Sequence, residues 1–204
     1  MTDYFALLNE RRRPWIEPDG LKQMFFRLSA EVHPDRVHNA SELEKLVAQQ
    51  RSTELNAAYN CLREPRERLR HLLELELGAK PEQVQTFPAD LVDLSLAVGR
   101  IGREVDSFLA EKAKTTSPLL QVQIFERGQE CAERLMELQN LISARQEEVT
   151  AGVRSLDENW ETGDGSAGPE RGARLKRLEE LYRRLSYLTR WSAQIQERIA
   201  QLAM

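Results

Sequence analysis

Residues 21–36 read LKQMFFRLSAEVHPDR, and this stretch organises the first third of the 204-residue chain. Its apolar positions follow the spacing i, i+4, i+7 and i+11, which is one face of a helix, and they are Leu21, Phe25, Leu28 and Val32. His33-Pro34-Asp35 ends this helix, because a residue that precedes proline is disfavoured in helical geometry. We therefore predict a helix over residues 20–32, with Asp19 as its N-cap.

Three more helices are predicted around this one. Asp3 caps a short aromatic helix over residues 4–8, and Pro65 suits the first position of a helix over residues 65–77. Ser41 and Glu44 have the spacing of a capping box, which begins a helix over residues 42–62. The apolar face of that helix is predicted to hold Leu43, Leu46, Val47, Leu55, Ala58, Tyr59 and Leu62.

The second part of the chain carries three apolar stripes with alternating steps of three and four residues. They are Leu91, Leu94, Val98, Ile101, Val105, Phe108 and Lys112; Cys131, Leu135, Leu138, Ile142, Arg145 and Val149; and Leu178, Leu181, Leu185, Leu188, Ser192, Ile195, Ile199 and Leu202. Each stripe covers about 30 Å or more at the rise of a helix. We predict an all-α fold that ends in a three-helix bundle, with a flexible Gly-rich loop near residues 158–171.

Composition excludes several classes of function. The formal charge is −4, from 29 Lys and Arg against 33 Asp and Glu, which argues against binding nucleic acid by neutralising phosphates. No apolar run approaches the roughly 18 residues of a membrane span, and residues 1–13 lack the apolar core of a secretory signal. Two distant cysteines, Cys61 and Cys131, fit a reducing compartment. We expect a cytoplasmic protein without nucleic-acid or membrane partners.

The usual catalytic patterns are missing from the sequence. It contains no Gly-rich phosphate loop and no G-x-S-x-G nucleophile motif. His33, Asp35 and His38 lie around a proline without the further ligands of a zinc site. We therefore expect no catalytic residue, no metal site and no cofactor. Arg11-Arg12-Arg13 is expected to be a solvated loop.

Four segments carry a resemblance to a known family. They are Asp3-Tyr4-Phe5-Ala6-Leu7-Leu8, Glu31-Val32-His33-Pro34-Asp35-Arg36, the stretch SxxLNxAYxxLRxP over residues 52–65, and the stretch RLRHLLEL over residues 68–75. Together they resemble the HscB-type J-proteins, which are co-chaperones of iron–sulfur cluster assembly. The resemblance covers about the first 77 residues. The chain also has a helical C-terminal block, as that family does, in place of the Gly/Phe-rich and cysteine-rich segments of general DnaJ proteins.

This resemblance implies a J-domain that stimulates the ATPase of a DnaK-type, HscA-like chaperone. His33, Pro34 and Asp35 would form the docking loop, with Asp35 offering a carboxylate to an arginine of the chaperone. Lys22, Arg27 and Arg36 would supply positive charge that steers the encounter. The protein itself would perform no covalent chemistry, so it is not expected to be an enzyme.

The resemblance also implies that the C-terminal block binds an iron–sulfur scaffold protein, IscU-like, through the start of its first helix. The matching residues here are Leu91, Val92, Leu94 and Leu96. Family members carry acidic residues nearby, whereas this chain has Ser95, Val98 and Gly99. Leu91 and Leu94 fit the apolar stripe, so Val92 or Leu96 is expected to be exposed and available to a partner.

The predicted organisation is a J-domain over residues 1–77, a linker over residues 78–89 and a helical bundle over residues 90–204. The protein is predicted to be a monomer. Two other readings stay open. One keeps the J-domain and changes the client. The other is a helical adaptor that pairs its apolar stripes with a partner coiled coil and has no chaperone activity.

Overall fold

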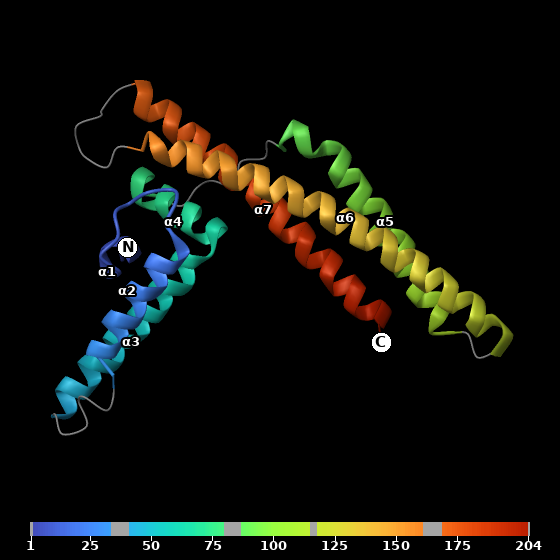
Figure 1. Ribbon diagram of the computed structural model, residues 1–204, viewed down its shortest axis with the longest axis horizontal. Helices are drawn as coiled ribbons and strands as arrows, with labels where there is room; N and C mark the ends of the chain where they lie inside the picture. The colour runs from blue at the N-terminus through green and yellow to red at the C-terminus, as the bar shows by residue number, and fades with distance from the viewer. Residues whose placement is uncertain (1, 34–40, 80–86, 115–117, 161–168, 204) are drawn as a thin grey trace. The chain divides into compact units, whose positions relative to one another are not determined.

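The computed structural model describes residues 2–33, 41–79, 87–114, 118–160 and 169–203. The helices of this part of the chain are α1 (Tyr4–Leu7), α2 (Pro18–Glu31), α3 (Glu42–Arg63), α4 (Pro65–Leu77), the 3-10 helix η2 (Ala89–Leu91), α5 (Val92–Lys112), α6 (Pro118–Glu158) and α7 (Pro169–Ala203) (Figure 1). The described residues contain no strand. The all-α prediction is confirmed.

The first four helices begin and end for local reasons that the sequence carries. Asp3 caps α1 by accepting hydrogen bonds from the backbone N–H groups of Phe5 and Ala6, at 3.0 and 3.2 Å. Ser41 and Glu44 form the predicted capping box of α3. Helix α2 begins at Pro18 rather than after Asp19, since proline suits the first helical position and leaves Asp19 inside the first turn. Gly78 ends α4 in the left-handed conformation, with φ 70°.

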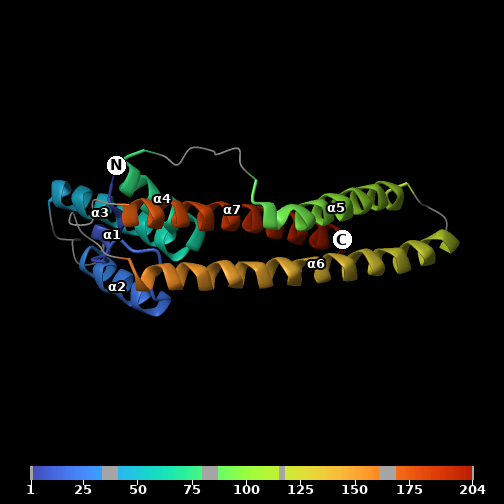
Figure 2. The same cartoon turned by 90° about the horizontal axis from the view of Figure 1, so that it is seen from above.

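Helices α2 and α3 lie side by side in both views (Figures 1 and 2). Phe25 of α2 stacks on Tyr59 of α3 with ring centroids 4.3 Å apart. The core of this part is apolar and fully buried, and its largest members are Phe5, Leu8, Leu21, Leu55, Leu62, Leu69, Leu72 and Leu73. The largest core residues of helices α1 to α4 and their connections are thus leucines and one phenylalanine.

The three long helices α5, α6 and α7 carry the predicted apolar stripes. Their buried positions include Val98, Ile101, Val105, Phe108, Leu135, Leu138, Ile142, Leu178, Leu181, Leu185, Leu188 and Ile195. Polar contacts also join these helices. Gln139 Nε2 of α6 donates a hydrogen bond to Ser192 Oγ of α7 at 2.9 Å, and Arg198 of α7 forms an ion pair with Asp106 of α5 at 3.0 Å. The predicted bundle helices are confirmed. Arg145, predicted on a stripe, is exposed and pairs with Glu148.

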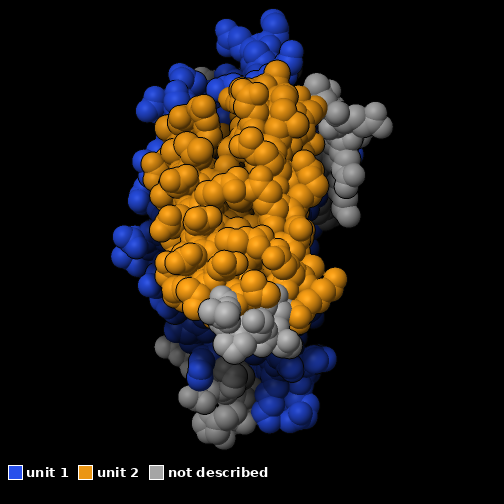
Figure 3. Space-filling view, turned by 90° about the vertical axis from the view of Figure 1, so that its right-hand side faces the viewer, with its two compact units in different colours: residues 1–84, 152–182 blue, residues 85–151, 183–204 orange. Residues whose placement is uncertain are grey.

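The chain divides into two compact units (Figure 3). Unit 1 holds residues 1–84 and 152–182, and unit 2 holds residues 85–151 and 183–204. Helices α6 and α7 therefore contribute to both units, whereas the sequence suggested a division at residues 78–89. Within the predicted loop near 158–171, α6 continues to Glu158 and α7 begins at Pro169. None of the described helices combines the length and apolar content needed to cross a membrane.

Candidate functional site

The outer surface of α2 carries the first group of predicted site residues. Lys22 and Arg27 are exposed, and neither forms an ion pair with another described residue. Lys22 Nζ lies 5.9 Å from the ring centroid of the exposed Phe26, and Arg27 Nη2 lies 2.9 Å from Met24 Sδ. Lys22 and Arg27 are five residues apart, about 140° around the helix. Helix α2 therefore presents its positive charge over a broad surface rather than along one line.

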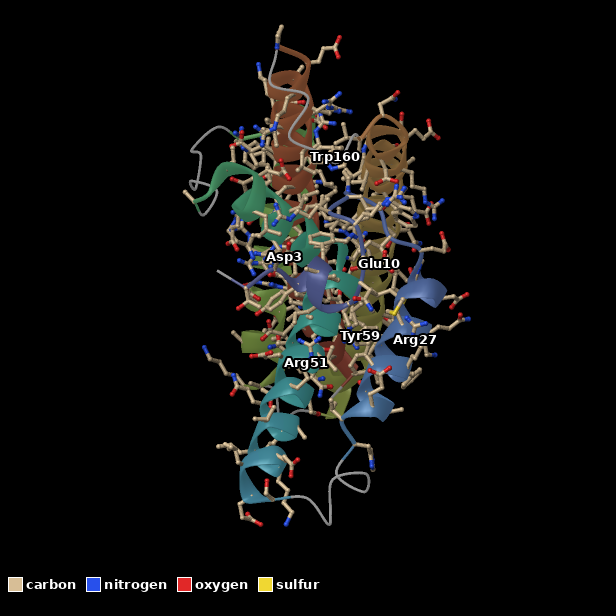
Figure 4. All side chains as sticks on the ribbon, turned by 90° about the vertical axis from the view of Figure 1, so that its left-hand side faces the viewer. Asp3, Glu10, Arg27, Arg51, Tyr59 and Trp160 are labelled. Atoms are coloured by element: carbon tan, nitrogen blue, oxygen red, sulfur yellow. The ribbon has the colours of Figure 1, made fainter. Side chains whose placement is uncertain are left out.

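His33 is exposed and comes one residue after Val32, the C-cap of α2. The Val32 N–H bonds the Ser29 carbonyl at 3.3 Å, which closes the last turn of the helix. Pro34, Asp35 and Arg36 lie outside the described residues. The structure therefore places the start of the predicted docking loop at the exposed end of the α2–α3 pair. Figure 4 shows Arg27 on α2 and Tyr59 between α2 and α3.

The first turns of α3 differ from the sequence prediction. Leu43, Leu46 and Val47 were expected to be part of the apolar inner face, but their exposed fractions are 70%, 61% and 60%. The buried positions of α3 are Ala48, Leu55, Ala58, Cys61 and Leu62. At 100° per residue, Leu43 has the same phase as the buried Cys61, and Val47 lies within about 20° of the buried Ala58. Helix phase therefore does not explain their exposure. The three side chains precede Ala48, the first buried residue of α3, and they form an exposed apolar patch near the end of α2.

Arg68 of α4 fixes the segment that leads into α2. It is buried, and it donates from Nε to the Pro14 carbonyl and from Nη1 to the Leu62 carbonyl, both at 2.8 Å. Its guanidinium carbon lies 5.5 Å from the centroid of the Trp15 ring. Burial lowers the pKa of Arg68 to about 10, so the group stays charged near neutral pH. One buried cation thus ties α3, α4 and the approach to α2 together.

Asp157, near the end of α6, holds the same segment from another side. Its carboxylate accepts hydrogen bonds from the Arg13 guanidinium and, at 3.1 Å, from the Trp15 backbone N–H. The Arg154 guanidinium carbon lies 4.2 Å from the Trp15 ring centroid, and Trp160 Nε1 donates to the Arg12 carbonyl at 2.9 Å. The three arginines are exposed, as predicted, and Arg13 in addition fixes this segment through its ion pair with Asp157. Asp3 also pairs with Arg12 at 2.8 Å; Figure 4 labels Asp3 and Trp160.

His71 of α4 holds the start of α1. Its Nε2 accepts a hydrogen bond from the Tyr4 backbone N–H at 3.1 Å, which requires that nitrogen to be unprotonated. The ring stacks on Phe5 with centroids 5.8 Å apart, and burial lowers the pKa of His71. Neutral His71 is thus the form that the folded protein uses.

The predicted client-binding residues separate into buried and exposed members. Leu91 is buried, Leu94 is half-buried, and Val92 and Leu96 have exposed fractions of 43% and 67%. They lie at the start of α5, where Asp90 pairs with Arg184 at 3.3 Å. The structure leaves Val92 and Leu96 accessible to a partner, and it places Leu91 in the core of unit 2. Among the described residues, no group of three or more His, Cys, Asp or Glu is placed to hold a metal ion.

Comparison with known sequences finds relatives that share one description. No known family profile matches the chain. It is 38% identical over 73 residues to a co-chaperone protein HscB homolog from Azoarcus sp. (strain BH72), and 34% identical over 91 residues to another from Chromobacterium violaceum. These stretches are 36% and 44% of this chain and 41% and 52% of those relatives. The chain thus spans about half the length of the curated relatives it matches.

Comparison with solved structures covers almost the whole chain. The fold matches the chaperone HscB from Vibrio cholerae with a TM-score of 0.63 at 17% identity, over 98% of this chain and 99% of that one. The resemblance to HscB-type co-chaperones is confirmed. The human co-chaperone protein HscB matches with a TM-score of 0.62 at 20% identity, over 97% of this chain and 82% of that one. The HscB fold thus includes the long helices as well as the short ones.

Proposed function

We propose that this protein is an HscB-type J-protein that stimulates the ATPase of a DnaK-type, HscA-like chaperone. His33, Pro34 and Asp35 form the docking loop, and Asp35 offers its carboxylate to an arginine of the chaperone. The observation that carries the proposal is the exposed His33 directly after α2, the helix that carries the exposed Lys22 and Arg27, in a fold that matches HscB structures. Arg36 follows in the same motif.

In this proposal the protein catalyses no reaction itself, and it acts by coupling its own binding to a conformational change of the chaperone. A co-chaperone shifts its partner only if it binds one state of that partner more tightly than another. Cations on α2 raise the rate of encounter with an acidic surface. Desolvating apolar side chains supplies affinity once the partners meet. The exposed Leu43, Leu46 and Val47 offer such side chains near the end of α2.

We also propose that the start of α5 binds an iron–sulfur scaffold protein, IscU-like, as client. Val92 and Leu96 are the accessible members of the predicted set, and Leu91 and Leu94 support the helix from the inside. In this proposal, residues 1–77 are the J-domain, residues 78–89 a linker and residues 90–204 the client-binding part. The protein acts as a cytoplasmic monomer.

Single-turnover ATP hydrolysis by a purified DnaK-type chaperone tests the first part. The protein is added with and without a purified iron–sulfur scaffold. We expect stimulation that His33→Gln or Asp35→Asn abolishes while the helical circular dichroism spectrum stays unchanged. His38→Gln is the matched control, since it makes the same chemical change five residues along the chain.

The outcomes separate the candidate functions. Stimulation that the scaffold increases supports the specialised co-chaperone. If the scaffold leaves the stimulation unchanged, the J-protein function is supported and the assignment of this client is rejected. No stimulation of any DnaK-type chaperone rejects the proposal and favours the helical adaptor, which would then show concentration-dependent association in sedimentation.

A further inference from the structure

The exposed side of α5 changes character along its length. Val92, Leu96, Arg100 and Arg103 lie at i, i+4, i+8 and i+11, so they share one face of the helix, and all four are exposed. The first two are apolar and the last two are cationic. Neither Arg100 nor Arg103 forms an ion pair with another described residue. An apolar patch therefore continues directly into uncompensated positive charge.

Gly99 brings the charge close to the apolar patch. Helical side chains lean toward the N-terminus, and Arg103 Nη1 lies 3.6 Å from the position that a Cβ would occupy on Gly99. Because Gly99 has no side chain, the guanidinium lies over the helix backbone one turn from Leu96. This arrangement leaves the N–H donors of Arg103 next to an exposed leucine.

A groove of about 470 Å³ between α5 and α6 begins at the same arginine. Its charged lining consists of Arg103, Arg127, Arg134, Glu104 and Glu130. Arg134 pairs with Glu104 at 2.6 Å, and Arg127 pairs with Glu111 at 2.7 Å. Arg103 is thus the lining cation without a carboxylate partner among the described residues. Glu130 also lines the groove, so its charge disfavours an anion near that side chain and favours one held at Arg103.

From this arrangement we propose that the α5 face binds a protein segment that carries an apolar side chain followed, about one helical turn on, by a carboxylate. The apolar side chain covers Val92 and Leu96, and the carboxylate pairs with Arg103, with Arg100 beside it. This inference rests on the proposed function, because the segment belongs to the client. It goes further by assigning the client acidic chemistry and by adding two arginines to the interface.

Charge also sets the direction in which the segment lies. Asp93 is exposed next to Val92 and forms no ion pair with a described residue, and Asp90 lies one turn before it. A carboxylate at that end of the patch would meet like charge. The acidic group of the client is therefore directed toward the C-terminal end of α5, where the two arginines lie.

Calorimetric titration of the full-length protein with a purified iron–sulfur scaffold tests the inference, at low and at high salt. We expect Arg103→Glu to weaken binding about tenfold or more and to reduce its salt dependence, since truncating or reversing a partner of a charge pair affects both. Arg103→Lys should retain most of the affinity. Leu96→Ala should also weaken binding about tenfold, as the loss of an apolar contact at the centre of an interface does.

Lys114→Glu is the matched control, because it makes the same charge reversal two residues after the end of α5, more than about 13 Å along the chain axis from Arg103. It should change affinity by less than about twofold, as a charge outside the contact does at physiological salt. If the scaffold binds and Arg103→Glu leaves the affinity unchanged or raises it, the inference is wrong while the client assignment stands. If the wild-type protein does not bind the scaffold, the client assignment itself is wrong, and the inference falls with it.

Discussion

The buried polar and charged side chains of the described residues all lie in unit 1, and the described interior of unit 2 contains none. Arg68, His71, Glu74 and Asp157 have exposed fractions of 3–8%. The core of unit 2 consists of leucine, isoleucine, valine, phenylalanine and one tryptophan from α5, α6 and α7 and the residue that precedes α5. The two units of one all-helical chain thus use different interactions to fix their helices.

The difference follows from the non-helical backbone of unit 1 rather than from helix length alone, because α3 of unit 1, at 22 residues, is as long as α5. Helices α5, α6 and α7 have 21, 41 and 35 residues, so each can bury a long apolar stripe. Unit 1 contains the four-residue α1 and a segment from Asn9 to Glu17 without a helix. The backbone carbonyls and N–H groups of such a segment have no helical partners and need side chains to satisfy them. Arg68 and Asp157 supply those hydrogen bonds.

The largest effect should come from removing the Arg68 guanidinium while keeping an unbranched apolar chain. We expect Arg68→Met to lower the free energy of unfolding by about 3–5 kcal/mol, because it leaves the Pro14 and Leu62 carbonyls buried and unpaired. Urea denaturation followed by circular dichroism measures it. Arg68→Lys should recover part of the loss, since it keeps the charge and one donor. A loss below about 1 kcal/mol for Arg68→Met would show that water replaces the guanidinium.

The matched change in unit 2 should be far milder. Leu135 is fully buried in α6, and we expect Leu135→Met to cost less than about 1.5 kcal/mol because volume and polarity are conserved. Leu135→Ala should cost about 2–5 kcal/mol through the cavity it creates. The same denaturation experiment ranks all of these variants. If Leu135→Met were as damaging as Arg68→Met, the contrast between the units would fail.

The sequence predicted unit 2 well and the Arg13–Asp157 ion pair of unit 1 poorly, for a physical reason. A repeat of three and four residues specifies a helix face without knowledge of the partner, so the buried positions of α5 to α7 could be predicted. Arg13 and Asp157 are 144 positions apart, and nothing in the local sequence of either one indicates the other. The capping box of α3 was predictable because Ser41 and Glu44 satisfy each other within one turn.

The candidate site also contains features that the local sequence predicted and features that it did not. The apolar spacing and Pro34 were enough to predict the end of α2 before His33, and the exposure of Val92 and Leu96 followed from the phase of α5. The exposed start of α3 was missed because apolar spacing predicts a helix face but not where along the helix its burial begins. Helix phase would not have separated Leu43 from the core, because Leu43 and the buried Cys61 are five full turns apart. The role of Arg103 depends on Gly99 and on a groove, neither of which a spacing rule describes.

The next largest effect should be a pH dependence of stability that arises from His71 of unit 1. Burial lowers the pKa of His71 in the folded state, while the unfolded chain has the ordinary value of about 6.5. Below that pH the unfolded state binds a proton that the folded state does not, so stability falls as the pH drops from 7 toward 5. Thermal unfolding across this range measures the effect. His71→Gln keeps an acceptor for the Tyr4 N–H and should reduce the slope; an unchanged slope would assign it to other groups.

The smallest effect concerns two glycines with opposite surroundings. A Cβ on Gly152 would lie 3.0 Å from Leu181 Cδ2, and Leu181 is buried, so Gly152→Ala crowds a side chain that cannot move away. A Cβ on Gly99 would meet only the exposed Arg103, at 3.6 Å. Alanine is favoured over glycine inside a helix by about 1 kcal/mol. We therefore expect Gly99→Ala to raise the free energy of unfolding by about 0.5–1 kcal/mol.

Gly152→Ala should instead lower it, because overpacking costs about 1–3 kcal/mol and offsets the gain in helix propensity. Urea denaturation of the two alanine variants side by side measures the difference in sign. Gly152 and Leu181 belong to unit 1, where the ends of α6 and α7 approach closely, and Gly99 lies on the open face of unit 2. Stabilisation by both substitutions would mean that the Leu181 side chain moves to accommodate the added methyl group, and that the packing of α6 against α7 at Gly152 is looser than the distance suggests.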